Sequence, residues 1–249
     1  MEDNSRNENI IYGRNAVLEA LKSEREFDKI FIKSGEKEGS ISLIMAKAKE
    51  RRIPILDAPQ RKLDDLASGG VHQGVVAVLA EVNYASVEDI LDNAKNKGES
   101  PFIVICDGIS DPHNLGAVIR SAECAGAHGI IIPKRRSAGV NGTVVKSSAG
   151  AVNLLPIARV SNIASTIDNL KDIGVFVYGA EAGGLNVYDT DITGACAVVL
   201  GSEGEGISRL VKSKCDFIVS IPMYGSVNSY NVSCAAAIIL SESARKRHK

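Results

Sequence analysis

Short apolar runs alternate with segments of helical periodicity from Pro101 to the end of the chain, and this pattern limits the fold more than any other feature. The runs that we interpret as strands are Phe102–Cys106, Gly129–Ile132, Asn153–Ile157, Val175–Tyr178, Ala197–Leu200 and Phe217–Ile221. The helices between them are predicted at Asn114–Ala125, Thr143–Ser148, Ile163–Ile173, Ile207–Lys214 and Asn231–Arg247. Nearly continuous apolar strands separated by helices are typical of a parallel sheet that is buried on both faces. Residues 100–249 are therefore predicted to form an α/β domain.

The first part of the chain shows the same alternation over a shorter length. Strands are predicted at residues 28–33, 54–58 and 74–82, with helices within residues 11–23 and at residues 42–52. Residues 10–82 are thus predicted to form a separate, small α/β domain. The polar segment 83–99 is interpreted as a linker that carries a short helix, and residues 1–9 as a flexible tail.

The composition at first argues against nucleic acid as a partner. Lys and Arg number 29 and Asp and Glu 30, so the formal net charge is −1, whereas proteins that bind phosphate backbones are usually basic. Aromatic residues make up only 4% and Trp is absent, which disfavours a large platform for base stacking. Composition alone therefore favours a small-molecule enzyme, although local basic clusters exist, for example at residues 134–136.

Cysteine and histidine usage argues against disulfides and metals. The five Cys are an odd number without a C-x-x-C pair, and the four His have no metal-ligand spacing. The polar first residues lack an apolar signal segment, and the apolar runs are far shorter than the roughly 20 residues that span a bilayer. We expect a cytoplasmic protein with no metal and no membrane contact. A G-x-S-x-G elbow is also missing, so a hydrolase triad is not indicated.

Polar residues and glycines gather after three of the predicted strands, where parallel sheets bind ligands. The first such segment, residues 107–126, contains Asn114 near a helix start and Arg120, the only charge between Leu115 and Ala122. Both could be structural, with Asn114 capping the helix and Arg120 in solvent. The choice between a site and a cap stays open at this point.

The other two segments are a Gly-rich turn and a polar helix start. In residues 198–208, Glu203 and Glu205 would repel phosphate, so the turn suits a ligand with amines or hydroxyls, or one bound by backbone amides. The third segment, residues 221–235, offers Ser229, Asn231 and Ser233 before a helix rich in small residues. Helix capping is again the structural alternative.

Together, the three segments resemble the three motifs of the SpoU (TrmH-type) family of RNA ribose 2′-O-methyltransferases. The matching residues are Asn114, Gly116, Arg120, Ser121, Ala122 and Gly126; Leu200 to Gly204 and Gly206; and Ile221 to Met223, Ser229 and Asn231 to Ser233. Tyr230 stands where the family usually has Leu. Residues 11–21 and 72–78 are similar to the ribosomal-protein-like substrate-binding domain of members that methylate a guanosine of 23S rRNA. Transfer-RNA members usually lack this domain.

The resemblance implies a SPOUT-type fold, with the C-terminal segment threaded through a trefoil knot, and a homodimer. It implies S-adenosylmethionine as methyl donor, with no metal. The donor pocket would be lined by Gly179, Ala180, Gly201, Ile221, Met223 and Tyr230. The implied catalytic set is Asn114, Arg120, Glu203, Ser229 and Asn231. RNA contacts are expected from Arg14, Arg120, Lys134, Arg135 and Arg136. Transfer RNA as substrate, or a non-catalytic RNA-binding assembly factor, are the alternatives.

The role of Arg120 can be narrowed on chemical grounds. A guanidinium stays protonated at neutral pH, so Arg120 is a poor base. It is better suited to bind a phosphate and stabilise the developing oxyanion. In this hypothesis Asn114 orients Arg120 or the ribose, Ser229 and Asn231 position the hydroxyl, and Glu203 is an acid/base or orienting group.

Overall fold

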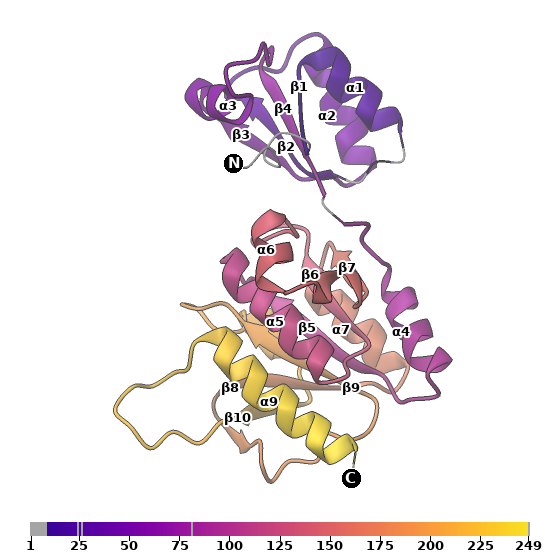
Figure 1. Ribbon diagram of the computed structural model, residues 1–249, viewed down its shortest axis with the longest axis vertical. Coiled ribbons are helices and arrows are strands. Elements are labelled where there is room, and N and C mark those ends of the chain that lie inside the picture. Colours follow the sequence, from indigo (N-terminus) through magenta and orange to yellow (C-terminus); the bar gives the residue numbers. More distant parts are fainter. Residues whose placement is uncertain (1–8, 24, 26, 81, 249) are drawn as a thin grey trace. The chain divides into compact units, whose positions relative to one another are not determined.

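A computed structural model describes residues 9–23, 25, 27–80 and 82–248. The chain divides into two compact units, residues 1–83 (unit 1) and 84–249 (unit 2), which are described separately (Figure 1). Of the predicted tail, only Asn9 lies within the described residues, and its carbonyl accepts a hydrogen bond from the Leu79 N–H at 2.8 Å.

Unit 1 is a four-stranded sheet with helices on both faces. Its strands are β1 (Ile10–Tyr12), β2 (Phe27–Lys33), β3 (Ile55–Ala58) and β4 (Val75–Leu79), in the order β1-β4-β2-β3; β2 and β3 are parallel and the other pairs antiparallel. Its helices are α1 (Arg14–Lys22), α2 (Ser40–Glu50) and α3 (Gln60–Leu66). Alternate residues of β4 face opposite cores: Val75 packs with α1 and α2, and Val76 with Leu63 of α3. The predicted α/β pattern is confirmed, but β1 and α3 were not predicted.

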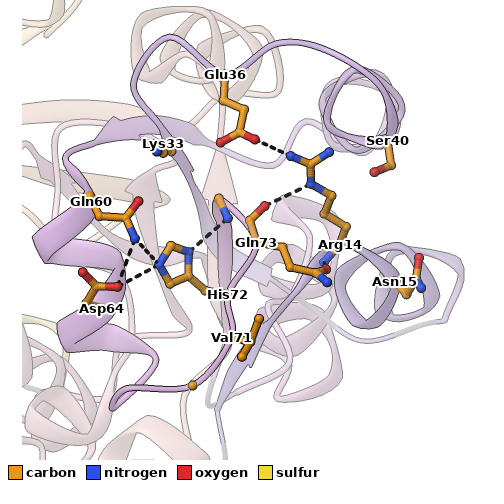
Figure 2. Close-up of a pocket in the computed structure, with 12 residues that line it drawn as sticks. Arg14, Asn15, Lys33, Glu36, Ser40, Gln60, Asp64, Val71, His72 and Gln73 are labelled. Atoms are coloured by element: carbon orange, nitrogen blue, oxygen red, sulfur yellow. Dashed lines mark hydrogen bonds and ion pairs between the residues drawn. The ribbon is translucent and has the colours of Figure 1, made fainter.

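A polar network holds the loop before β4 (Figure 2). His72 is buried, and its Nδ1 accepts the Gly74 N–H at 3.0 Å. Its Nε2 therefore carries the proton and donates to Asp64 Oδ1 at 3.0 Å. On the other side of the loop, Arg14 donates from Nε to the Gln73 carbonyl at 3.0 Å and forms an ion pair with Glu36.

Unit 2 is a six-stranded, wholly parallel sheet. Its strands are β5 (Phe102–Asp107), β6 (Gly129–Pro133), β7 (Ile157–Val160), β8 (Phe176–Asn186), β9 (Cys196–Gly201) and β10 (Phe217–Ser220), in the order β10-β8-β9-β5-β6-β7. The prediction of a strand at 153–157 is wrong. Residues Ala151–Asn153 form a 3-10 helix, and the strand begins only after Pro156, which has no N–H for the ladder.

Helices cover both faces of this sheet (Figure 1). The helices of unit 2 are α4 (Val87–Asn96), α5 (Pro112–Cys124), α6 (Gly142–Ser147), α7 (Ile163–Asp172), α8 (Arg209–Lys212) and α9 (Val232–Arg247). Residues of α4, α7 and α8 share one core, whereas α5 packs against β6, α6 and α9. Helix α4 lies in the segment that was predicted to be a linker. Ile90 of α4 is fully buried against Gly129, so closely that a Cβ on Gly129 would collide with it. The segment therefore packs on the sheet of unit 2, which begins at Tyr84.

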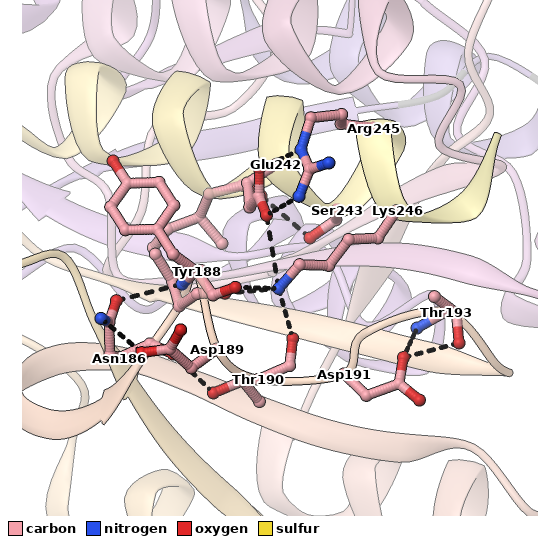
Figure 3. Close-up of polar contacts among 12 residues, drawn as sticks. Asn186, Tyr188, Asp189, Thr190, Asp191, Thr193, Glu242, Ser243, Arg245 and Lys246 are labelled. Atoms are coloured by element: carbon pink, nitrogen blue, oxygen red, sulfur yellow. Dashed lines mark hydrogen bonds and ion pairs between the residues drawn. The ribbon is translucent and has the colours of Figure 1, made fainter. Parts of the chain in front are cut away.

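The last turns of α9 are tied to the connection between β8 and β9 (Figure 3). The Lys246 ammonium donates to the carbonyls of Val187, Tyr188 and Thr190 at 2.9, 2.9 and 2.7 Å. It also forms an ion pair with Glu242 at 3.3 Å. Hydrogen bonds from Arg245 lower the pKa of Glu242 to about 2. The helix that follows the third motif is thus fixed at its far end by charged groups.

Candidate active site

The carboxyl ends of β5, β9 and β10 lie at one edge of the parallel sheet, and each of these strands leads into one of the three motif segments. Asp107, the last residue of β5, lies beside Gly201, the last residue of β9. Its Oδ2 accepts the Ser208 N–H at 2.8 Å, which joins the first motif to the end of the Gly-rich turn. This is the edge at which open parallel sheets bind ligands.

The turn after β9 folds back on itself because position 201 has no side chain. A Cβ there would lie 2.1 Å from the Gly206 carbonyl carbon and 2.3 Å from the Ile207 nitrogen. Ser202 and Gly206 exchange backbone hydrogen bonds of 3.0 and 3.1 Å across the turn. Gly206 has φ +68°, a conformation that favours glycine.

A cavity of about 460 Å³ opens beside this turn. The residues predicted from the sequence that line it are Ala180, Gly201, Glu203, Ile221, Met223, Ser229 and Tyr230. Gly179 is not among the residues that line the cavity. It is packed against Ile218, Cys215 and Ile207, which a Cβ at this position would contact. The walls come from the ends of β8, β9 and β10, the 221–230 segment and the first turns of α9.

One chain of hydrogen bonds connects the three motifs. Asn231 donates from Nδ2 to Asn114 Oδ1 at 3.1 Å, and Asn114 donates from Nδ2 to Glu203 Oε1 at 2.8 Å. The direction is fixed at its start, because Asn231 Oδ1 accepts the Ser233 N–H at 2.9 Å. Every later amide must then donate towards Glu203. Three of the five predicted catalytic residues are thus brought together from positions 89 and 117 residues apart.

The structural alternative is excluded for Asn114 and holds in part for Asn231. The cap of α5 is Asp111, whose Oδ1 accepts the His113 N–H at 2.9 Å, so Asn114 is free to bond with the other motifs. Asn231 does cap α9, but its remaining amide group faces Asn114.

Arg120 is not part of this chain. It is exposed on α5 and forms no hydrogen bond or ion pair with the described residues. Six residues after Asn114, it lies about 9 Å further along the helix and roughly 120° around it. A guanidinium in this position can reach out to an anion in solvent rather than to Glu203.

The basic segment after β6 lies at the same edge of the sheet. Ser137 Oγ and the Ala138 N–H both donate to the Ile109 carbonyl, at 3.0 and 2.8 Å, so this segment lies against the first motif. Arg135 and Arg136 are exposed. Lys134 lies directly after β6, and Arg14 lies in unit 1, in the network described above.

Two acidic residues at this edge were missed from the sequence. Asp107 holds the Gly-rich turn, as described. Glu181 lines the cavity and forms an ion pair with Lys212 at 2.6 Å through Oε1, whereas its buried Oε2 has no hydrogen-bond partner among the described residues. Both follow apolar strand residues, and this is the signal that could have identified them.

The described part of the chain contains no cluster of three or more His, Cys, Asp or Glu side chains that could hold a metal. Burial raises the pKa of the Cys106 and Cys196 thiols to about 12 and about 11, so neither is an activated nucleophile. Among the described helices, none is both long and apolar enough to cross a membrane.

Comparison with known families agrees with this geometry. Residues 101–241 match the SpoU rRNA methylase family, and residues 10–85 match the family described as RNA 2′-O ribose methyltransferase substrate binding. The chain belongs to the SpoU rRNA methylase family. It is therefore an RNA methyltransferase, and the expectation of a small-molecule enzyme from composition is wrong, because net charge does not reveal local basic segments.

Two relatives with the name TrmH family tRNA/rRNA methyltransferase cover nearly all of the chain. The protein from Staphylococcus haemolyticus is 46% identical over 241 residues, 96% of each chain. YacO of Bacillus subtilis is 42% identical over 245 residues, 98% of each chain.

Solved structures of this family have the same fold. The SpoU methyltransferase AviRb from Streptomyces viridochromogenes, in complex with AdoMet, is 26% identical, with a TM-score of 0.60, and the match covers 96% of this chain and 90% of that one. The TrmH/SpoU tRNA modifying enzyme from A. aeolicus is 27% identical, with a TM-score of 0.55 and coverage of 60% of this chain and 77% of that one.

Proposed function

We propose that this enzyme transfers the methyl group of S-adenosylmethionine to the ribose 2′-hydroxyl of a guanosine in 23S rRNA. The observation that carries the proposal is the directed chain from Asn231 through Asn114 to Glu203, beside a cavity of ligand size. Since this series of hydrogen bonds ends at the Glu203 carboxylate, it holds a hydrogen-bond acceptor at the site. A ribose hydroxyl that must lose its proton needs such an acceptor.

The residues at the cavity fit the methyl donor. Its volume of about 460 Å³ is within the range of small-molecule sites. The orphaned Glu181 Oε2 supplies an acceptor for a hydroxyl or an amine. Ala180, Gly201, Ile221, Met223 and Tyr230 would hold the donor, and Gly179 would support the floor through its close packing. When bound, S-adenosylmethionine supplies an electrophilic methyl group on a sulfonium.

The other predicted residues act on the RNA in this proposal. Glu203 Oε1 is occupied by Asn114, so the second oxygen accepts the hydrogen bond of the ribose hydroxyl. Ser229, which lines the cavity, and Asn231 position that hydroxyl. Arg120 binds the neighbouring phosphate and stabilises the developing negative charge. Arg14, Lys134, Arg135 and Arg136 contact the backbone of the RNA.

Ribosomal RNA is favoured over transfer RNA by unit 1. The tRNA modifying enzyme from A. aeolicus covers 60% of this chain, whereas residues 10–85 here match a substrate-binding domain of RNA 2′-O ribose methyltransferases. A second RNA-binding domain suits a large, structured RNA. Transfer RNA remains the second candidate, because the names of the relatives include both RNA classes.

The assembly that we propose is a cytoplasmic homodimer with a trefoil knot in unit 2. Support for the dimer comes from large apolar side chains that are exposed in one chain, with Tyr224 97% and Val227 72% exposed. The knot is proposed from the resemblance to the SpoU family, whose model matches residues 101–241.

The test offers tritiated S-adenosylmethionine with unmodified 23S rRNA and with unmodified bulk tRNA. Label is expected in 23S rRNA, at a 2′-O-methylguanosine. Arg120→Ala is expected to abolish transfer, while calorimetry shows unchanged binding of S-adenosylhomocysteine. Label in tRNA alone would overturn the substrate, and full turnover by Arg120→Ala would overturn the role of Arg120.

A further inference from the structure

Unit 1 contains a cavity of its own, of about 760 Å³, far along the sequence from the methyl-transfer residues (Figure 2). It lies between the start of α1, the end of β2, α3 and the loop before β4. Its lining residues are Arg14, Asn15, Lys33, Glu36, Ser40, Gln60, Asp64 and Gly70 to Gly74. This volume is within the range of sites that bind small ligands or single groups of larger ones.

The walls of the cavity are held in one arrangement by buried or paired polar groups. His72, 5% exposed, bonds to Asp64 on one side and to Gly74 on the other. Gln73 has φ +51°, a conformation that is uncommon for a residue other than glycine. This turn directs its carbonyl to Arg14 Nε, and its side-chain oxygen accepts the Arg14 N–H at 3.0 Å. Gly74 has φ +81°, a conformation that favours glycine, and the Glu36 carboxylate packs against it.

The electrostatics of the cavity do not suit a bare phosphate. Its two cations, Arg14 and Lys33, are balanced by Glu36 and Asp64, and Arg14 is already paired with Glu36. A backbone phosphate is bound by an excess of positive charge, which raises the salt dependence of binding. The charge balance therefore favours a neutral ligand group.

The unused hydrogen-bonding groups point to a flat, neutral group with both donors and acceptors. Among the described residues, no partner occupies the side-chain amide of Asn15 or the nitrogen of the Gln73 amide. Val71 is 79% exposed at the rim, where it can cover an apolar face. Nucleobases that are unstacked in RNA are recognised by this combination of edge hydrogen bonds and contacts to the ring face.

We propose that this cavity binds one unstacked nucleobase of the RNA substrate. The inference rests on the proposed function and deepens it, because it assigns base readout to unit 1 and chemistry to unit 2. Unit 1 then selects the RNA by a base as well as by backbone charge.

The experiment measures the affinity of the full-length protein for in vitro transcribed 23S rRNA and for unmodified tRNA, by filter binding over a range of salt concentrations. Asn15→Ala is expected to weaken binding of the RNA that the enzyme methylates roughly tenfold, which corresponds to the loss of one good polar contact to a base. Gln73→Asn, which keeps an amide and tolerates the backbone conformation, is expected to act in the same direction. Ser42→Ala is the control, since Ser42 is a neutral residue exposed on α2 outside the cavity.

The salt dependence separates a base from a phosphate. Loss of a base contact leaves the slope of log affinity against log salt unchanged, whereas loss of one phosphate contact reduces it by about 0.7 to 0.9. The proposal is overturned if Asn15→Ala binds as Ser42→Ala does, or if the slope falls by that amount. Methyl transfer by the wild-type protein, and calorimetric binding of S-adenosylhomocysteine, report on the proposed function independently. A wild-type protein that transfers methyl groups while Asn15→Ala binds RNA normally would refute the cavity alone.

Discussion

The hydrogen-bond chain of the active site can be tested by replacing one of its amides with a carboxylate of the same shape. In Asn114→Asp, one oxygen still accepts from Asn231, but the other replaces the Nδ2 that lies 2.8 Å from Glu203 Oε1. A charge-assisted hydrogen bond is lost, which corresponds to about 1.5–3 kcal/mol. We expect kcat to fall roughly 10- to 150-fold at pH 8.

The same variant has a characteristic pH dependence. At low pH the two carboxylates share one proton, which restores a hydrogen bond between them, and at higher pH both ionise and repel each other. The ratio of variant to wild-type kcat should therefore fall as the pH rises. Asn114→Ala, which has no charge to titrate, should be slow at every pH by a constant factor.

The assay is incorporation of a tritiated methyl group at saturating donor and RNA, between pH 6 and 9. Asn153→Asp is the matched control, because it adds the same charge at an exposed position of unit 2 that is not part of the hydrogen-bond chain from Asn231 to Glu203. Calorimetry with S-adenosylhomocysteine checks that the donor site is intact. A kcat ratio within threefold of wild type, or one that is flat across this pH range, would refute the role of the Asn114–Glu203 bond.

Three further predictions concern the turn and the end of α9. Gly201→Ala forces the backbone near Gly206 to move and should weaken binding of S-adenosylhomocysteine at least tenfold by calorimetry, whereas Gly194→Ala, with open space around its Cβ, should not. Lys246→Met keeps the alkyl chain but loses three hydrogen bonds to carbonyls, which should lower the free energy of unfolding by about 3 kcal/mol in urea; an unchanged midpoint would contradict this. The Glu242 carboxylate, with its pKa lowered from 4.5 to about 2, contributes stability that is present above about pH 4.5 and lost as the pH falls towards 2. Glu242→Gln should remove this part of the acid sensitivity, as measured by thermal unfolding.

The sheet of unit 2 was accessible from the sequence because its strands are buried on both faces. Phe102–Cys106 was predicted and Phe102–Asp107 is observed, and the limits of β6 and β9 agree to a similar degree. Helix α3 was not predicted, because only Leu63 of its seven residues is buried and the apolar period is too weak to detect. The strand predicted at 153–157 was placed too early in the chain, because the observed strand, Ile157–Val160, begins only after Pro156.

The site shows the same limit. The resemblance to the SpoU motifs implied Asn114, Glu203 and Asn231 as site residues, and the structure joins them through hydrogen bonds. The distinction between a cap and a site could not be made from one residue, because it depended on Asp111 capping the helix instead. The network around Arg14 and Gln73 joins residues that are 59 positions apart in the chain, and no local pattern encodes it.

The place of β9 in the sheet has a consequence for synthesis of the protein. This strand lies between β5 and β8, yet it is made after both, so the centre of the sheet stays open until residue 201 has been translated. Long-range pairings of this kind slow folding, because loop closure must precede the contacts that stabilise it. We expect unit 1 to fold while the chain is still on the ribosome, and unit 2 to fold only around the time of release. An exposed, half-built apolar sheet at that stage is a target for chaperones and a risk for aggregation.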